Sequence, residues 1–389
     1  MSQPKNITYL LGAGASANCL PVIDELPERL KYFRSEIEDR VDGKQINSLT
    51  GVYEDADIRF KNNTSNSIGQ QLISDIDWLL DELDNHSTVD TLARRFYLKK
   101  SSHPGLFKLK KVLVTYFLFE QGAKIGEIRE GQIKQLPDKR YDTLIATIIS
   151  KHINDLSLPP NFKIITWNYD IQFELAYKYY TGLEINDIQT KYQCFPTVDF
   201  LDNLKSVDLE KFSLIRLNGV ALNKTINPFF GKFIYGDGED WEVIRYTDFL
   251  AKTLTLYNGL KEEDLRLFTY SWEDYSEFKS IHSNKNHVLK EALKVMEKTD
   301  ILIIIGYSFP LFNRSIDKEL ISVCAKNTKK IYIQDPRAKE IQDLLVSSFP
   351  FLVTPEMYHS MSGMGVKHTP VEFVSSSLDQ FLIPYELDL

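Results

Sequence analysis

The chain has 389 residues, of which 43% are hydrophobic, and its 46 basic and 54 acidic residues give a formal net charge of −8. This length suits two or three average domains, or one α/β domain with large insertions, and the apolar fraction is enough for a sizeable core. The negative balance argues against a protein that binds nucleic acid through its overall field. The densest basic cluster, at Lys108, Lys110 and Lys111, is expected to be a solvated helix face.

Three cysteines, Cys19, Cys194 and Cys324, are dispersed along the chain without any Cys-x-x-Cys pair. Such a set is not a disulfide framework and offers no zinc module, so we expect no metal. The N-terminus has no signal segment, and the longest apolar run, Ile301 to Ile305, is far shorter than the ~20 residues that span a bilayer. We therefore expect a cytoplasmic protein that binds neither membrane nor nucleic acid directly.

Short apolar runs alternate with segments of helical periodicity. The predicted strands are Ile7–Leu11, Phe162–Thr166, Phe212–Leu217, Asp300–Ile305, Lys330–Gln334 and Val371–Val374. The predicted helices are Ile68–Leu83, Phe107–Gln121, Tyr141–Ile153, Ile171–Tyr180, Val288–Glu297, Arg314–Ala325 and Arg337–Ser347. Strands that are apolar at nearly every position are typical of parallel sheets covered on both faces. The pattern predicts an α/β fold, a doubly wound, Rossmann-like parallel sheet with large, mostly helical insertions.

We interpret residues 1–389 as a single domain with two insertions. The first two predicted strands are separated by about 150 residues, which is long for one crossover. A mostly helical insertion is therefore placed at about residues 40–158. A second insertion, rich in aromatic and acidic residues, is placed at about residues 221–287.

The first predicted strand is followed directly by Gly12-Ala13-Gly14-Ala15-Ser16-Ala17, which has the form Gly-x-Gly-x-x-Ala. Glycines permit a tight turn and let backbone N–H groups approach a pyrophosphate at a helix start, so Gly12, Ala13, Gly14, Ala15 and Ser16 are candidate cofactor-binding residues. A plain strand–helix turn is the alternative. A dehydrogenase would place an acidic residue at the end of a second strand ~20 positions later, but residues 21–30 indicate a loop and then a helix.

Three more predicted strands end in polar motifs. These are Thr166-Trp167-Asn168-Tyr169-Asp170, Leu217-Asn218-Gly219 and Gly306-Tyr307-Ser308. Ligands of open α/β sheets bind at the carboxyl ends of strands, so Thr166, Asn168, Gly306, Ser308 and also Asp335 are candidate cofactor-binding residues. Each motif has a simpler reading: a helix cap, an ordinary turn, or a loop after a buried strand.

The segment Ser87-Thr88-Val89-Asp90-Thr91-Leu92 follows the first predicted helix, and Ser87 or Thr88 is expected to cap the next one. His86 and Asp90 form the one His/Asp pair near such a junction, which makes both candidate catalytic residues. A lone surface histidine is the alternative for His86.

Together these motifs resemble the sirtuin superfamily of NAD-dependent enzymes, and more closely the sirtuin-like NAD hydrolases of bacterial antiphage defence. The resemblance covers the sheet core and neither insertion. The matching residues are Gly12–Ser16, Asn168 with Asp170, Asn218-Gly219, Gly306 with Ser308, and Ser87–Leu92, which is similar to the Ser-Ile/Val-Asp-Thr stretch of the defence branch.

This chain differs from the deacetylating sirtuins at residues that those enzymes use for metal binding and catalysis. Those enzymes carry a four-cysteine zinc module, which three dispersed cysteines cannot build, and a Phe-Arg pair where this chain has Leu20-Pro21. Their catalytic histidine corresponds to Asn218, which cannot act as a base at neutral pH. Protein deacylation is therefore disfavoured, whereas cleavage of NAD by water is less demanding.

The resemblance implies cleavage of the nicotinamide–ribose bond of NAD to nicotinamide and ADP-ribose. Asn168 is expected to position the ribose or a water. Asp170, or less favourably Asp90, is expected to supply negative charge. Asn218 is expected to hold a ribose hydroxyl, and His86 is a reserve candidate for the base. The family also implies gating, through homo-oligomerisation or a partner such as a HerA-type ATPase. The main alternative is a non-catalytic NAD or ADP-ribose receptor in a defence complex, and the sequence also allows Asn218 to be an engineered replacement of a histidine.

Overall fold

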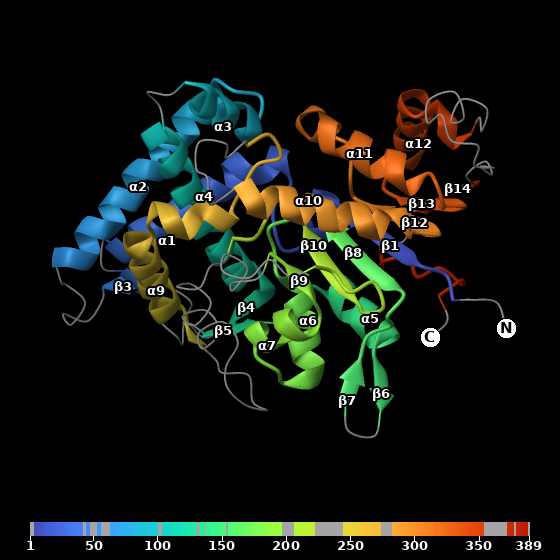
Figure 1. The fold of residues 1–389 in the computed structure, drawn as a ribbon. Coiled ribbons are helices and arrows are strands. Elements are labelled where there is room, and N and C mark those ends of the chain that lie inside the picture. Colours follow the sequence, from blue (N-terminus) through green and yellow to red (C-terminus); the bar gives the residue numbers. More distant parts are fainter. Residues whose placement is uncertain are drawn as a thin grey trace.

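The core of the protein is a seven-stranded sheet in which every pair of neighbouring strands is parallel, seen in Figure 1. The computed structural model describes residues 4–41, 44–46, 53–55, 63–99, 103–129, 132–135, 137–152, 155–196, 206–221, 244–273, 282–353, 372–376 and 379–387. The strands, in their order across the sheet, are β14 (Glu372–Ser376), β13 (Lys330–Gln334), β12 (Ile301–Ile305), β1 (Ile7–Leu11), β8 (Phe162–Thr166), β10 (Ser213–Arg216) and β9 (Cys194–Phe195).

The strand order changes direction beside β1. From β1 the chain builds β8, β9 and β10 on one side, and then crosses to build β12, β13 and β14 on the other. A crossing of this kind opens a crevice at the carboxyl ends of the two central strands, which is where open α/β sheets bind ligands. The ends of β1 and β12 are the sites of the first and fourth motifs.

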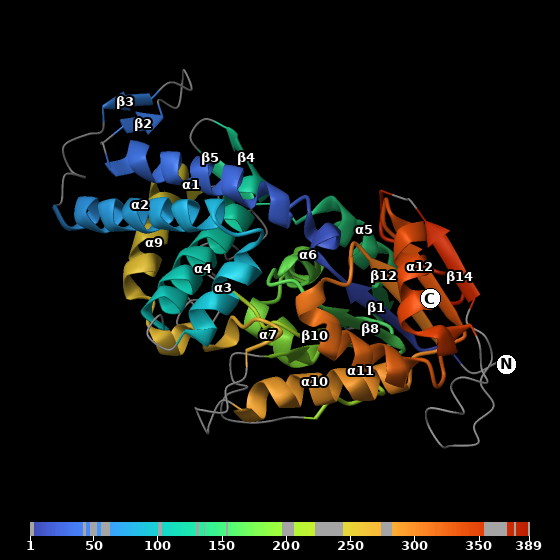
Figure 2. The same cartoon turned by 90° about the horizontal axis from the view of Figure 1, so that it is seen from above.

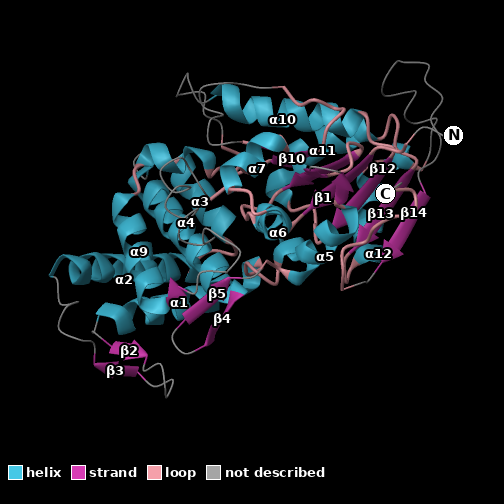
Figure 3. Ribbon diagram, turned by 90° about the horizontal axis from the view of Figure 1, so that it is seen from below, coloured by secondary structure: helices cyan, strands magenta, loops and turns pink. Residues whose placement is uncertain are grey.

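Helices cover both faces of the sheet, which explains why all five residues of β1 are buried. One face packs against α10 (His282–Glu297), α11 (Arg314–Cys324) and α12 (Ala338–Ser348). The other packs against α5 (Lys139–Ile148), α6 (Gln172–Thr181) and α7 (Ile185–Lys191). Figure 1 shows α10, α11 and α12 above the strands and α5, α6 and α7 below them, and Figure 3 shows the strands of the sheet side by side in magenta. The predicted doubly wound fold is confirmed.

A second group of helices forms a layer with its own hydrophobic core beside the sheet, as Figure 2 shows. Its members are α1 (Leu26–Val41), α2 (Asn63–Asp84), α3 (Val89–Leu98), α4 (His103–Ile125) and α9 (Tyr246–Gly259). Because α9 follows β10 in the chain, residues from both proposed insertions meet in this helical layer. Only residues 221, 244–273 and 282–287 of the second proposed insertion are among those described. No described helix is long and apolar enough to cross a membrane.

The remaining short strands pair outside the main sheet. They are β2 (Lys44–Ile46) with β3 (Tyr53–Asp55), β4 (Gly126–Arg129) with β5 (Gln132–Gln135) and β11 (Ile244–Arg245), and β6 (Ser150–His152) with β7 (Asp155–Ser157). All of these pairs are antiparallel.

The basic cluster on α4 is not the solvated face that its charge predicted. Lys110 is 7% exposed, and its Nζ lies 2.7 Å from Glu273 Oε1. Lys108 pairs with the buried Asp75 at 2.8 Å, and Lys111 lies over the ring of Tyr257. The prediction was wrong because the acidic and aromatic partners lie on other elements of the helical layer, and a buried ammonium group is retained only when it is paired.

Candidate functional site

A cavity of about 210 Å³ lies at the carboxyl ends of the central strands. All four sequence motifs contribute to its lining, and so does the segment that begins α3. The lining residues from these motifs are Ala13, Ser16, Trp167, Asn168, Tyr169, Asn218, Gly306, Tyr307 and Ser308, and the α3 segment adds Val89 and Asp90. Residues that are remote in sequence therefore meet at the place where a doubly wound sheet binds its ligand.

Seven of the 21 residues that line the cavity are aromatic. Trp167 and Tyr307 stack at 5.9 Å with 20° between their planes, and both line the cavity from the sheet side. Tyr169 stacks on Phe268 at 4.1 Å, and the ring of Phe117 of α4 lies 5.9 Å from each of them. The motif search did not find Phe117 or Phe268, because these residues come from the helical layer and no local pattern distinguishes them from core residues.

The glycines of the first motif pack against the fourth motif. A Cβ atom on Gly12 would lie 2.5 Å from the carbonyl oxygen of Gly306, and one on Gly14 would lie 2.8 Å from the Gly306 Cα. Gly306 has φ of +59°, and a Cβ there would lie 2.4 Å from the Ala15 nitrogen. Glycine is therefore required at these positions so that two strand ends can touch.

This contact also uses most of the N–H groups that were expected to bind a pyrophosphate. Gly12 donates to the Ile305 carbonyl at 3.0 Å, Gly14 to the Gly306 carbonyl at 3.0 Å, and Ala15 to the Gly12 carbonyl at 2.9 Å. Of the four amides from Gly12 to Ala15, only that of Ala13 has no acceptor within the described structure, and Ala13 lines the cavity. The turn thus offers a ligand one N–H group at this point rather than a cradle of several.

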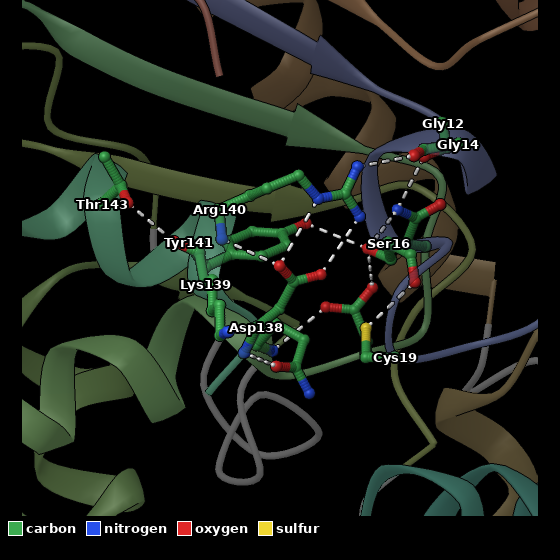
Figure 4. A network of polar contacts seen from close by, with 12 residues as sticks. Gly12, Gly14, Ser16, Cys19, Asp138, Lys139, Arg140, Tyr141 and Thr143 are labelled. Atoms are coloured by element: carbon green, nitrogen blue, oxygen red, sulfur yellow. Dashed lines mark hydrogen bonds and ion pairs between the residues drawn. The ribbon is translucent and has the colours of Figure 1, made fainter. Parts of the chain in front are cut away.

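Ser16 lies at the centre of a polar network, shown in Figure 4. Its hydroxyl donates to Asp170 Oδ2 at 2.6 Å and accepts a hydrogen bond from Asn168 Nδ2 at 2.9 Å. The Tyr141 hydroxyl lies 3.0 Å from the same oxygen, and it must be the donor because the Ser16 proton is already used. Ser16 lines the cavity, but its hydroxyl is committed within the protein and does not serve a phosphate.

The network fixes the orientation of Asn168. Its Nδ2 donates to the Gly12 carbonyl oxygen at 2.9 Å as well as to Ser16. A carbonyl oxygen only accepts, so the amide nitrogen has to face Gly12. Asn168 is 8% exposed and lines the cavity, and its Oδ1 is the polar atom left to meet a ligand hydroxyl or a water.

Asp170 lies behind this network, not at the cavity lining. Both carboxylate oxygens are used, since Oδ1 accepts from the Gln172 N–H at 3.0 Å and Oδ2 from Ser16. Burial raises the pKa of Asp170, while the hydrogen bonds from Ser16 and Gln172 oppose that rise. Arg216 donates to the Asp170 carbonyl oxygen at 3.1 Å and forms a buried ion pair with Glu174. Asp170 is placed to hold Ser16 and the start of α6.

Asp90 is the charged side chain that reaches the cavity. None of the other residues that line it is an aspartate, glutamate, lysine, arginine or histidine. Asp90 lies in the first turn of α3, which begins after Thr88, whose hydroxyl accepts from the Thr91 N–H at 3.2 Å. Burial raises the pKa of Asp90 to about 6. The carboxylate is therefore still ionised at neutral pH.

Three other candidates lie away from the cavity lining. His86 Nδ1 is 2.7 Å from the Glu82 carbonyl oxygen and so carries the proton, while Nε2 accepts from Arg95 at 3.1 Å. The Thr166 hydroxyl accepts from the Asn168 N–H at 3.0 Å, and Asp335 Oδ1 accepts from the Arg337 N–H at 2.8 Å beside the start of α12. Both ring nitrogens of His86 are therefore hydrogen-bonded within the protein, and His86 does not line the cavity where a base would act.

Two polar atoms in the cavity residues are buried without a partner among the described residues. They are Asn218 Oδ1, an acceptor, and Trp167 Nε1, a donor. The Asn218 amide nitrogen makes only a long contact of 3.5 Å to the Trp167 carbonyl oxygen. Buried polar groups in proteins are nearly always satisfied, so these two atoms are exceptions among the described residues.

Comparison of the sequence with protein-family models and with curated proteins finds no match. Within the described part of the chain, no group of three or more His, Cys, Asp or Glu side chains is arranged to hold a metal ion. Function is therefore inferred from the chemistry of the cavity.

Proposed function

We propose that the protein is an NAD hydrolase that cleaves the nicotinamide–ribose bond and releases nicotinamide and ADP-ribose. The observation that supports this most strongly is the meeting of four strand-end motifs at one aromatic cavity with a single carboxylate, Asp90. The doubly wound sheet supplies the location, since its switch point is the usual site of a nucleotide.

The demands of the reaction suit a cavity whose one charged lining side chain is the carboxylate of Asp90. The leaving group is a cationic pyridinium, so it departs without protonation and leaves an oxocarbenium-like sugar. The protein has to hold the ribose, stabilise positive charge and position a water, whose oxygen bonds to the sugar carbon and whose proton passes to solvent. Asn168 Oδ1 accepts a hydrogen bond from a ribose hydroxyl or from that water.

Negative charge for the transition state is assigned to Asp90. The sequence favoured Asp170 for this role, but both oxygens of Asp170 are bonded to protein groups and it does not line the cavity. Asp90 does line it, and a carboxylate in a partly dry site stabilises a nearby cation far better than one in water. Asp170 becomes a positioning residue that acts through Ser16.

The test is nicotinamide release by purified full-length protein, followed by chromatography, for wild type and Asn168→Ala. Loss of a positioned polar group typically costs 10²–10³ in rate, so we expect a fall of about 100-fold. Asn327→Ala is the matched control, because Asn327 is an exposed asparagine that bonds to the Glu297 carbonyl oxygen. Thermal melts establish that both variants fold. Equal turnover by wild type and Asn168→Ala removes Asn168 from the mechanism.

A second candidate function is a receptor that binds NAD or ADP-ribose without cleaving it. Asn218 favours this, because neither it nor any other residue that lines the cavity is a histidine or lysine that could take a proton from water. Calorimetric binding of NAD with no product over hours would support the receptor. In that case Asn218→His, which supplies the missing base, is expected to start nicotinamide release.

A further inference from the structure

We infer that Asn313 is a ligand-binding residue of the cavity, whose Oδ1 accepts a hydrogen bond from a sugar hydroxyl of the bound nucleotide, and that Tyr307 and Asp317 are the positioning residues that orient it. The inference rests on the proposed function, because it adds a residue to the same site. Asn313 lies outside all four strand-end motifs, so the sequence analysis did not single it out.

The first support is the way in which Asn313 is hydrogen-bonded. It lines the cavity, and only 8% of it is exposed. It stands directly before α11, where an asparagine side chain usually caps the helix, yet it makes no capping hydrogen bond. Its Nδ2 instead donates to the Tyr307 hydroxyl at 3.1 Å, and no group in the described part of the chain donates to its Oδ1. This oxygen is therefore an acceptor available to a group that enters the cavity.

The second support is the pair of contacts that fixes the direction of the Asn313 amide. The Tyr307 hydroxyl lies 2.8 Å from both carboxyl oxygens of Asp317, which is buried. An ionised carboxylate only accepts, so the single phenolic proton is used there and the phenolic oxygen is left to accept. Only the nitrogen of the Asn313 amide can donate to that oxygen, so the amide cannot flip without losing the bond. Asp317 thus acts on the cavity through Tyr307.

The third support is the loop that carries Asn313 from β12 to α11. The Ser271 hydroxyl donates to the Phe312 carbonyl oxygen at 2.9 Å, which ties the loop to the segment after α9. Phe309 has φ of +55°, a left-handed backbone that a residue with a side chain rarely adopts. Such a backbone persists only where the surrounding structure holds it. The place of Asn313 beside Tyr307 is therefore set by the backbone as well as by side chains.

The chemistry of the oxygen indicates which ligand group it takes. A neutral amide oxygen is suited to a hydroxyl, which donates without bringing a charge into the cavity. Two amide oxygens, those of Asn168 and Asn313, then accept from the nucleotide, and Asp90 stays the one charged lining residue. The ligand class is a nucleotide with free sugar hydroxyls.

The first experiment measures binding without bond cleavage. ADP-ribose is titrated calorimetrically into full-length wild type and Asn313→Ala at pH 8.0, where Asp317, with a pKa of about 7, is mainly ionised. We expect Asn313→Ala to weaken binding about five- to tenfold, the effect of losing one hydrogen bond to an uncharged group. Asn327→Ala is the matched control, because Asn327 is exposed and bonds to the Glu297 carbonyl oxygen. Unchanged affinity in a folded Asn313→Ala, or no binding to wild type, overturns the inference.

The second experiment tests whether Tyr307 acts through Asn313. Tyr307→Phe keeps the ring at the cavity and removes the hydroxyl, and should weaken ADP-ribose binding about three- to fivefold. In the Asn313→Ala background the same change should have almost no effect, because the side chain that it orients is gone. Tyr332→Phe is the matched control, since its hydroxyl also lies against a carboxylate, that of Glu386, and Tyr332 does not line the cavity. Losses that multiply in the double variant would overturn the positioning role.

Asp317 is tested by a conservative and a non-conservative change. Asp317→Asn keeps an oxygen that accepts from Tyr307 and should bind ADP-ribose within about twofold of wild type. Asp317→Leu has a similar size without an acceptor and should bind as weakly as Tyr307→Phe. Thermal melts establish that each variant is folded, and wild-type affinity in a folded Asp317→Leu removes Asp317 from the positioning role.

A change of ligand separates the sugar from the base. Inosine diphosphate ribose lacks the adenine amino group, and Asn313→Ala should weaken its binding by the same factor. A loss confined to ADP-ribose would place the donor on the base and contradict the hydroxyl. Asn313-dependent binding without nicotinamide release would refute hydrolysis and leave the inference standing, whereas nicotinamide release with an unchanged Kd in Asn313→Ala would do the reverse.

Discussion

Asn168 and Asp170 stand two residues apart in one motif, yet they have different roles. Asn168 faces the cavity, while Asp170 is bonded to Ser16 and to the start of α6. The difference follows from the direction of each side chain after β8 and from the Tyr141 hydroxyl, which completes the bonds of Ser16 across 125 residues of sequence. One residue of this motif can therefore face a ligand while another only holds the residues that do.

Asp317 leads to a prediction about stability and pH. The Tyr307 hydroxyl lies 2.8 Å from both of its carboxyl oxygens, and burial raises the pKa of Asp317 to about 7. The unfolded carboxyl has a pKa near 3.9, so the folded state holds the proton more tightly. Stability from this group is fully present below the unfolded pKa and is lost as the pH rises through 7. The free energy of unfolding should fall by up to about 1.4 kcal/mol per pH unit between the unfolded pKa near 3.9 and the folded pKa of about 7.

The measurement is urea unfolding of wild type and Asp317→Asn at several pH values from 5 to 8. The variant should show a shallower decline with pH, because its side chain does not titrate. Asp343→Asn, which removes an exposed acid paired with Lys339, should keep the wild-type slope. Identical slopes for wild type and Asp317→Asn would mean that Asp317 is already ionised across this range.

At the level of single residues the sequence was most informative about position and least informative about role. It placed Asn168, Asn218 and Gly306 at strand ends, and the structure brings them to one cavity. It could not distinguish Asp90 from Asp170 as the cavity carboxylate, because that depends on which oxygens are already hydrogen-bonded. Those bonds come from residues that are remote in the chain, and local patterns carry no information about them.

At the level of elements, the turn after β1 and the turn after β12 are each shaped by the other. Gly306 combines a left-handed backbone with a position where a Cβ would lie 2.4 Å from Ala15 N. Gly182, at the end of α6, has a similar φ of +67° but nothing within 4 Å of a Cβ. Substituting Gly182 therefore tests the cost of the left-handed backbone alone, whereas substituting Gly306 adds steric overlap to the same backbone cost.

We expect Gly182→Ala to cost about 1–2 kcal/mol, the usual penalty for a left-handed residue with a side chain. Gly306→Ala should cost at least about 3 kcal/mol, because main-chain atoms of the first motif must also move. Urea unfolding followed by circular dichroism gives both values. An equal loss of unfolding free energy in the two variants would show that the turns after β1 and β12 move apart without a measurable energetic cost.

Most strands and helices of the sheet were predictable from the sequence, and the elements that were missed lacked a clear hydrophobic pattern. The runs Ile7–Leu11, Phe162–Thr166 and Lys330–Gln334 have the same bounds in the sequence analysis and in the structure. The short strand β9 and the helix α9 were missed. A strand of two residues carries no periodicity, and α9 lies in a segment whose aromatic residues suggested an insertion without indicating its secondary structure.

On the scale of the whole molecule, the cavity lies between two bodies of different composition. The sheet contributes the strand-end motifs, and the helical layer contributes Asp90, Phe117 and the segment with Phe268. Any shift of that layer against the sheet changes the cavity. This arrangement supports the proposal that activity is gated by self-association or by a partner such as a HerA-type ATPase, since unrestrained NAD cleavage would poison the host.

Gating predicts that nicotinamide release per chain rises with association. The rate per chain should be measured from dilute to concentrated full-length protein, with sedimentation in parallel, and again with a HerA-type ATPase added. We expect a low rate for single chains and a higher rate for the associated form. A rate per chain that is the same at every concentration, and indifferent to the partner, would contradict gating.

The contact between Gly12, Gly14 and Gly306 has a consequence for synthesis. The cavity needs residues from Ala13 to Asn313, and β1 pairs in register with β12, Ile7 opposite Ile301. A chain still emerging from the ribosome has the first motif but not the strand that supports it. It therefore cannot enclose a ligand until Asn313 has been released. Under the proposed function, an unfinished chain leaves the NAD of the cell that makes it untouched.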